Sequence, residues 1–210
     1  MGRKYRFSGP AAIALAAVTL WGAGRWAWPA QSGESMKSQT RSFLIDDFSK
    51  EEISSLGTRW QTFTDRVMGG ISDGRAAYET VEGKRCLRLR GNVSLENRGG
   101  FIQVALPLLP TEGEVFNAKD FKGVRLTVRG NGEAYFIHLR TSQTRLPWQY
   151  YAAPFKAGPR WEVVEIPFME FAPENLSSAL DPTQLRRIAV VAASKAFAAD
   201  VAVARLEFYR

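Results

Sequence analysis

The chain has 210 residues, of which 45% are hydrophobic, 23% charged and 12% aromatic, and this composition suits one globular domain of about 150–180 residues. Its 18 Gly and 10 Pro are spread along the sequence, which excludes collagen-like repeats and bulk disorder. The single Cys cannot form an internal disulfide, and the single His excludes zinc sites built on two or more histidines.

Residues 1–30 have the pattern of a signal peptide or a membrane anchor. Arg3, Lys4 and Arg6 precede a stretch from Phe7 to Gly24 that carries no charge. Basic residues followed by an apolar run are typical of an export signal, and a run of this length can also stay in the membrane as an anchor. The order predicts a domain exported to the extracytoplasmic side, with membrane contact only through this segment. If Met36 is the true start, the protein is instead cytoplasmic.

The excess of positive charge comes partly from this leading segment. It holds four of the 28 Lys and Arg residues and no acidic residue, so the net charge falls from +7 to +3 without it. A mildly basic domain argues against a nucleic-acid partner. Residues 31–42 are polar and rich in Ser, which predicts a flexible linker before the domain.

Residues 43–210 show the period-two alternation of β-strands. The expected strands are short and bounded by Gly, Pro, Asn or Asp; they cover residues 43–45, 84–90, 124–129, 135–140, 161–167, 188–193 and 201–208. Helical patterns are scarce, with a turn or two expected at 49–56 and 182–186. Many short strands without alternating helices predict an all-β fold, an antiparallel β-sandwich or barrel in one domain. Gly130-Asn131-Gly132 predicts a hairpin between two of the strands.

Two Gly-Gly segments stand out. The first runs from Trp60 to Ser72 and contains Asp65-Arg-Val-Met-Gly-Gly-Ile-Ser72; the second contains Ser94-Leu-Glu-Asn-Arg-Gly-Gly-Phe101. A third segment, from Gly123 to Gly132, has no Gly-Gly pair and is followed by Tyr135, Arg140, Tyr151-Ala152, Trp161 and Pro167-Phe168. In this order and spacing they resemble the NADH:ubiquinone oxidoreductase (complex I) intermediate-associated protein family, over residues from about 43 to 208.

The resemblance implies a galactose-binding-like jelly-roll sandwich and a role as an assembly factor or chaperone for respiratory complex I. It carries over no catalytic residue. Family members often have Asn before the Asp of the first motif, whereas this chain has Thr64, a change that affects one side chain and not the expected fold.

The short polar residues beside the glycines, Asp65, Ser72, Glu96 and Asn97, have two interpretations. Such side chains commonly accept hydrogen bonds from turn backbone. Alternatively they converge at one end of the sandwich and hold a ligand or a calcium ion with their oxygen atoms. No other metal site and no cofactor is expected.

The outward strand positions predict a binding surface. If Leu126, Val128, Ile137 and Leu139 face the core, then Arg125, Arg129, Phe136, His138 and Arg140 face outward on neighbouring strands, with Arg88 and Arg90 extending the same face. Trp148, Tyr150 and Tyr151 follow and are expected to rim it. Arg, Trp and Tyr are typical of protein-binding hot spots, and aromatic residues on an open jelly-roll face also suit sugar rings.

These patterns predict a non-enzymatic binding module for a protein partner, such as a respiratory-complex subunit or assembly intermediate. The alternative is a carbohydrate-binding protein of the cell envelope. A glycoside-processing enzyme is less favoured because no pair of acids stands out in the sequence, and His138 has no nucleophile or second His to act with.

Overall fold

The structure is a computed structural model that describes residues 42–210, so the predicted leader and all but the last residue of the predicted linker lie outside the described residues. The elements in this part are β1 (Phe43–Asp46), β2 (Gln61–Thr64), η1 (Asp65–Met68), β3 (Asp73–Val81), β4 (Lys84–Val93), η2 (Glu96–Arg98), β5 (Phe101–Pro107), β6 (Gly123–Gly130), β7 (Ala134–Thr141), β8 (Tyr150–Lys156), β9 (Glu162–Pro167), η3 (Phe168–Glu170), β10 (Ala172–Glu174), η4 (Pro182–Gln184), β11 (Leu185–Ala193) and β12 (Phe197–Tyr209). Between residues 42 and 210, no helix has the length and apolar character needed to cross a membrane.

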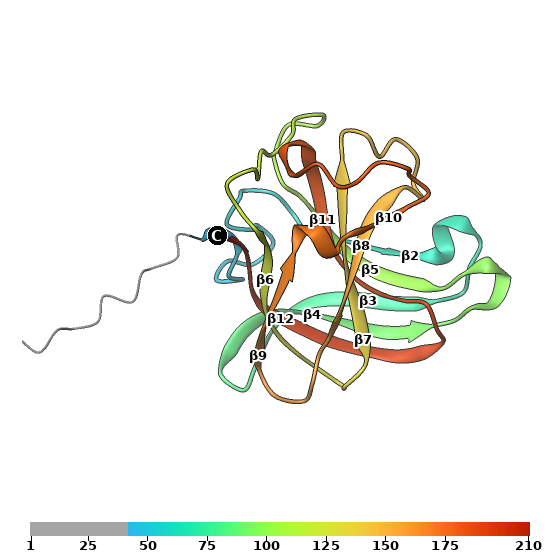
Figure 1. Cartoon of the computed structure of the whole chain (residues 1–210). Coiled ribbons are helices and arrows are strands. Elements are labelled where there is room, and N and C mark those ends of the chain that lie inside the picture. Colours follow the sequence, from blue (N-terminus) through green and yellow to red (C-terminus); the bar gives the residue numbers. More distant parts are fainter. Residues whose placement is uncertain (1–41) are drawn as a thin grey trace, which may run out of the picture. The chain divides into compact units, whose positions relative to one another are not determined.

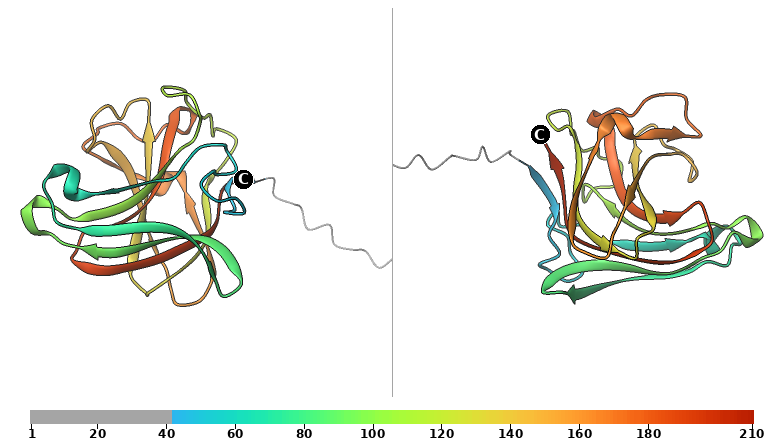
Figure 2. Two further views of the ribbon diagram at one scale, coloured as in Figure 1. Left: turned by 180° about the vertical axis from the view of Figure 1, so that it is seen from behind. Right: turned by 60° about the horizontal axis from the view of Figure 1, so that its bottom comes forward.

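The strands form two antiparallel sheets of six. Sheet A has the order β3-β4-β12-β6-β9, and β1 pairs with the end of β12; sheet B has the order β10-β8-β7-β11-β5-β2. Figures 1 and 2 show β3, β4 and β12 sweeping along one side of the domain while β7 and β8 run more nearly upright above them. The predicted all-β antiparallel sandwich is therefore confirmed.

The core lies between the two sheets and follows the predicted alternation. Leu126 and Val128 of sheet A, and Ile137 and Leu139 of sheet B, have no exposed surface. Aromatic rings fill the end of the sandwich near the C-terminus, where Phe208 packs within 6.5 Å, centroid to centroid, of Phe43, Phe116, Phe121 and Phe168. Burial of such side chains holds the domain together without a disulfide, since Cys86 is buried and free.

The predicted strands exist, but several elements were not predicted. Alternation did not reveal β2, β3, β5, β8 and β10. The turn expected within 182–186 is the single 3-10 turn η4, capped by the Asp181 carboxylate. Residues 49–56 form bends and a tight turn and no helix, so that expectation was wrong; the Ser54 hydroxyl there accepts from the Thr58 amide at 3.2 Å and offers the backbone an alternative to helix bonds.

The expected hairpin at Gly130-Asn131-Gly132 was also wrong. β6 pairs with β12 and β9, whereas β7 pairs with β11 and β8, so this connection passes from one sheet to the other. Alternation shows which side chains of a strand face the core, but both sheets turn aliphatic residues inward. It therefore does not show which strands are neighbours.

Candidate functional site

The predicted outward face is divided between the two sides of the sandwich. Arg125 and Arg129 lie on the outer face of sheet A, whereas Phe136, His138 and Arg140 lie on the outer face of sheet B. Arg88 and Arg90 belong to β4 and therefore to sheet A. The expectation of one continuous surface carrying all these residues was wrong, because β6 and β7 are not neighbours.

The arginines of sheet A have carboxylate partners within the chain. The Arg88 guanidinium donates to both oxygens of Asp200 at 2.7 and 2.6 Å, and Arg90 pairs with Glu79. Arg125 bridges Glu165 at 2.7 Å and the buried Glu207 at 2.9 Å, and Arg129 pairs with Glu82 at 2.8 Å. The positive charge of this face is thus neutralised internally, so it offers little excess charge to a partner.

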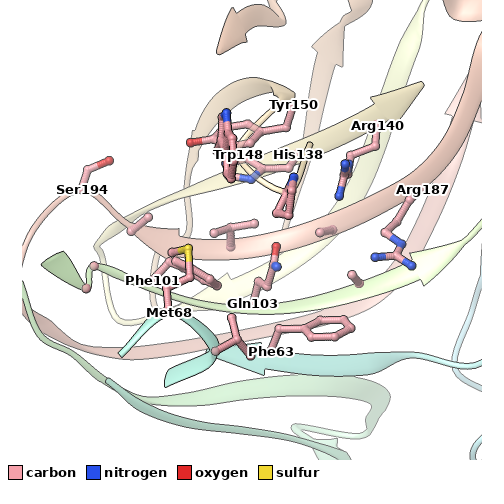
Figure 3. A pocket seen from close by; sticks show the side chains of 18 of the residues that line it. Phe63, Met68, Phe101, Gln103, His138, Arg140, Trp148, Tyr150, Arg187 and Ser194 are labelled. Atoms are coloured by element: carbon pink, nitrogen blue, oxygen red, sulfur yellow. The ribbon is translucent and has the colours of Figure 1, made fainter. Parts of the chain in front are cut away.

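Sheet B carries a trough on its outer face, with a volume of about 670 Å³. Its floor is made of small side chains of β5 and β11, including Ala105, Ala189 and Val191. Figure 3 shows Trp148, Tyr150 and His138 on one wall and Phe63, Met68 and Phe101 on the other. The trough spans five strands, from β8 to β2, and is therefore about 19 Å across at the usual strand spacing.

A flat ring pair forms part of one wall. His138 of β7 lies opposite Ala152 of β8, so Tyr150, two residues earlier, is its diagonal neighbour on the same face. The two rings stack with centroids 4.1 Å apart and planes 12° from parallel. Burial lowers the pKa of His138 to about 4, so the imidazole is neutral at physiological pH. Burial also raises the pKa of the Tyr150 phenol.

Trp148 stands at the rim of the trough and is held by its loop. The Trp148 side chain is 54% exposed. Arg140 supports this loop, because its guanidinium donates to the carbonyl oxygens of Thr144 at 3.0 Å and Leu146 at 2.8 Å. Arg140 is therefore a positioning residue for Trp148. Tyr151, by contrast, points into the core and is fully buried, so it does not rim the trough as expected.

The two Gly-Gly motifs meet at the Asp65 carboxylate. Its Oδ1 accepts from the Ser72 amide at 2.9 Å, and its Oδ2 accepts from the Ser72 hydroxyl and from the amides of Gly100 at 2.6 Å and Phe101 at 3.3 Å. Although burial alone raises the pKa of Asp65, these hydrogen bonds outweigh it and lower the pKa below its ordinary value. The motifs are thus a structural clamp that joins η1 to the start of β5.

The predicted polar cluster forms only in part. Asp65 and Ser72 are buried and in contact, while Glu96 and Asn97 are exposed on η2. Among residues 42–210, no group of three His, Cys, Asp or Glu side chains is placed to hold a metal ion. The carboxylate oxygens of Asp65 face protein donors, which supports the interpretation that these residues bind turn backbone. The clamp also fixes η1, whose Val67 and Met68 side chains are 72% and 56% exposed at the trough rim.

Gly70→Ala is expected to destabilise the domain by about 2–3 kcal/mol through overpacking. A Cβ at this position would lie 2.8 Å from Asp65 Cβ and closer still to the carboxyl group. Urea denaturation followed by tryptophan fluorescence measures the change. Gly158→Ala is the control, because its Cβ would meet only the flexible end of Glu162 at 3.3 Å; equal stability of the two variants would contradict the clamp.

Sequence reasoning missed the second wall of the trough. Phe63 and Met68 lie within the first motif but were not considered as binding residues, and Phe101 and Gln103 belong to the unpredicted strand β5. Arg187 was missed because the expected strand begins at residue 188, whereas β11 begins at Leu185. The aromatic residues around the motifs were the available signal, but only the pairing of β2, β5 and β11 places them opposite Tyr150.

Comparison with known proteins gives a family and a fold. The model of the family Complex I intermediate-associated protein 30 (CIA30) matches residues 47–198. Among solved structures, a family 11 carbohydrate-binding module of the cellulosomal cellulase Lic26A-Cel5E of Clostridium thermocellum is 13% identical, with a TM-score of 0.64 over 82% of this chain and 96% of that chain. A family 30 carbohydrate-binding module is also 13% identical, with a TM-score of 0.57 over 82% and 89% of the chains.

Another similar structure is the Clostridium thermocellum family 11 module in complex with a β-1,3-1,4-mixed-linked tetrasaccharide. It is 12% identical, with a TM-score of 0.61 over 80% of this chain and 95% of that chain. At these identities the likeness establishes the jelly-roll fold alone. No curated protein gives a significant match.

Proposed function

Because the chain belongs to the complex I intermediate-associated protein 30 family, we propose that it is a non-catalytic binding module that holds a partner protein during assembly of a respiratory complex. The trough of sheet B is the proposed contact surface. It combines an exposed Trp, a Tyr ring stacked on a neutral His, and apolar side chains on the opposite wall. Such a set of aromatic and apolar anchors in a depression is typical of the energetic centre of protein interfaces.

The observation that carries this proposal is the arrangement of Trp148 against Tyr150 and His138. Trp148 is 54% exposed although its loop is held by Arg140. An apolar ring held in solvent loses little conformational freedom when a partner covers it, and its burial is favourable. On the outer face of sheet A, by contrast, Arg88, Arg125 and Arg129 are paired with carboxylates of the same chain.

Trp148→Ala is expected to weaken partner binding by the module about 30-fold or more, a cost of about 2 kcal/mol or more in binding free energy. In a strain lacking the gene, the wild-type chain should restore the level of assembled complex on a native gel, while Trp148→Ala should not. Val163→Ala is the matched control, because Val163 is 63% exposed on β9 of sheet A. A deletion strain with unchanged levels of the complex would contradict the proposed role.

A carbohydrate ligand is the second candidate. The trough lies on the outer face of a sandwich sheet in a fold shared with carbohydrate-binding modules, and the Tyr150 and Trp148 rings could stack on sugars. An array of neutral oligosaccharides that includes the mixed-linked β-glucan tetrasaccharide tests it. Binding that is lost in Trp148→Ala would favour a carbohydrate ligand over a protein partner.

A further inference from the structure

Arginines gather at one end of the trough. Arg187 of β11 lies directly opposite Arg140 of β7 in the register of sheet B, and Figure 3 shows both side chains at the same end of the site. Arg187 alternates with the buried Ile188, and a bulge lies between Leu185 and Arg187. Because an extra residue shifts the alternation, Leu185 enters the core while Arg187 faces outward, with Arg186 beside them.

These arginines differ from those of sheet A in having no carboxylate partner. Among the described residues, Arg140, Arg186 and Arg187 form no ion pair, although the arginines on the outer face of sheet A's central strands do. Arg140 donates to neutral loop carbonyls, and Arg187 lies over the Phe63 ring at 5.9 Å. Burial, followed by the charges of Arg187 and Arg186, lowers the pKa of Arg140. This end of the trough therefore holds guanidinium groups without a direct ion pair, while Glu112 and Glu114 line an adjoining depression that Arg140, Arg186 and Arg187 also line.

The remainder of the trough is lined mainly by apolar and aromatic side chains, with the neutral polar residues Gln103, Asn175 and Ser194 among them, and it contains no acidic side chain among its described lining residues. Val67, Met68 and Phe101 form a hydrocarbon wall that suits apolar amino-acid side chains better than hydroxyl-rich sugar rings. At about 19 Å, the site accommodates about six residues of extended chain. The charge complement to the arginine end is a carboxylate, which a guanidinium pair recognises through charge-assisted hydrogen bonds.

Resting on the proposed function, we propose that the trough binds an extended acidic segment of the partner protein, with one Asp or Glu carboxylate between Arg140 and Arg187. Apolar residues of the same segment lie along the aromatic part, against Trp148, Tyr150 and Met68. The arginines set the register of the segment, and the rings supply most of the buried area.

Labelled hexapeptides provide a direct test. The hexapeptides consist of Leu, Phe and Ser, and in each peptide one position is replaced by Glu, Gln or Lys. Fluorescence polarisation measures their binding to the full-length protein. At one position Glu should bind about tenfold more tightly than Gln, and Lys more weakly than both. Arg187→Gln should remove this preference, whereas Arg129→Gln, an outer-face arginine of sheet A, should retain it. Arg187 is chosen because Arg140 also supports the Trp148 loop, and thermal unfolding verifies that each variant is folded.

Several outcomes would overturn this inference. Equal affinity for Glu and Gln peptides, or a Glu preference that survives in Arg187→Gln, would remove the arginine end as a carboxylate site. Binding of an acidic oligosaccharide such as tetragalacturonate in place of every peptide would assign the arginines to a sugar ligand. If Trp148→Ala still blocks complex assembly while no Glu preference exists, only the acidic segment is rejected; if Trp148→Ala has no effect as well, the proposed function is rejected with it.

Discussion

Asp65→Ala should lower the free energy of unfolding by about 3–5 kcal/mol, because it leaves buried backbone donors without acceptors. The amides of Ser72, Gly100 and Phe101 all donate to this carboxylate, and Asp65 has no exposed surface. The loss should appear in urea denaturation followed by tryptophan fluorescence. It should also loosen η1 and the start of β5, and so disturb the trough wall that carries Met68 and Phe101.

The acid response gives a second readout of the same clamp. Since the folded state lowers the pKa of Asp65, its stabilising effect is present above the pKa of the unfolded chain and is lost as the pH falls through the folded value. Asp73→Ala is the control, because Asp73 is exposed at the start of β3, and its effect should stay within about 0.5 kcal/mol. An Asp65→Ala variant as stable as the control would show that the motif is not a clamp.

His138 should make the domain less stable by about 2 kcal/mol when the pH falls from 7 to 5. The imidazole has a pKa of about 4 in the folded state against an ordinary value of 6.5. Between these values the unfolded chain binds a proton that the folded chain does not, so acidification favours unfolding. Tyr150 stacks on the ring and Arg140 lies on the same strand, while the acidic Glu174 lies opposite Tyr150 on β10 but is not among the residues that line the trough.

The measurement is urea denaturation of the wild type and His138→Gln at pH 7 and pH 5. The variant should lose much less stability than the wild type over this interval, because the chain contains no other His and carboxylates titrate mainly below it. The same loss in both proteins would assign the effect to another group and would show that His138 is protonated freely in the folded state.

The fold was predictable because the alternation of apolar and polar residues within each strand indicates which side chains face the core. The inward residues Leu126, Val128, Ile137 and Leu139 were identified from alternation alone, and the family resemblance supplied the jelly-roll arrangement. Strand neighbours were not predictable in the same way. Pairing is a long-range property, and the Gly130-Asn131-Gly132 turn fits a connection between sheets as well as it fits a hairpin.

The site was predictable only in pieces, for the same physical reason. Phe136, His138, Arg140, Trp148 and Tyr150 were placed together correctly because β7 and β8 are neighbours in both sequence and space. Phe63, Phe101 and Arg187 come from strands that are distant from β7 and β8 in the sequence, and Arg187 lies one residue before the strand expected at 188–193. Arg125 and Arg129 show the reverse error, since closeness in sequence to β7 placed them on the wrong side of the sandwich.

The two Gly-Gly motifs, which are the most recognisable part of this sequence, direct their backbone amides to the Asp65 carboxylate. The Asp65 oxygens and the glycines packed against them are used to join one loop to another, and the guanidinium and indole groups of the trough come from segments outside these motifs. A sequence search with the two Gly-Gly motifs is therefore expected to find proteins that share this fold. Differences in what they recognise are expected from the β7–β8 loop and the bulged start of β11, which face the trough wall that the two motifs supply and which can vary without changing the motifs.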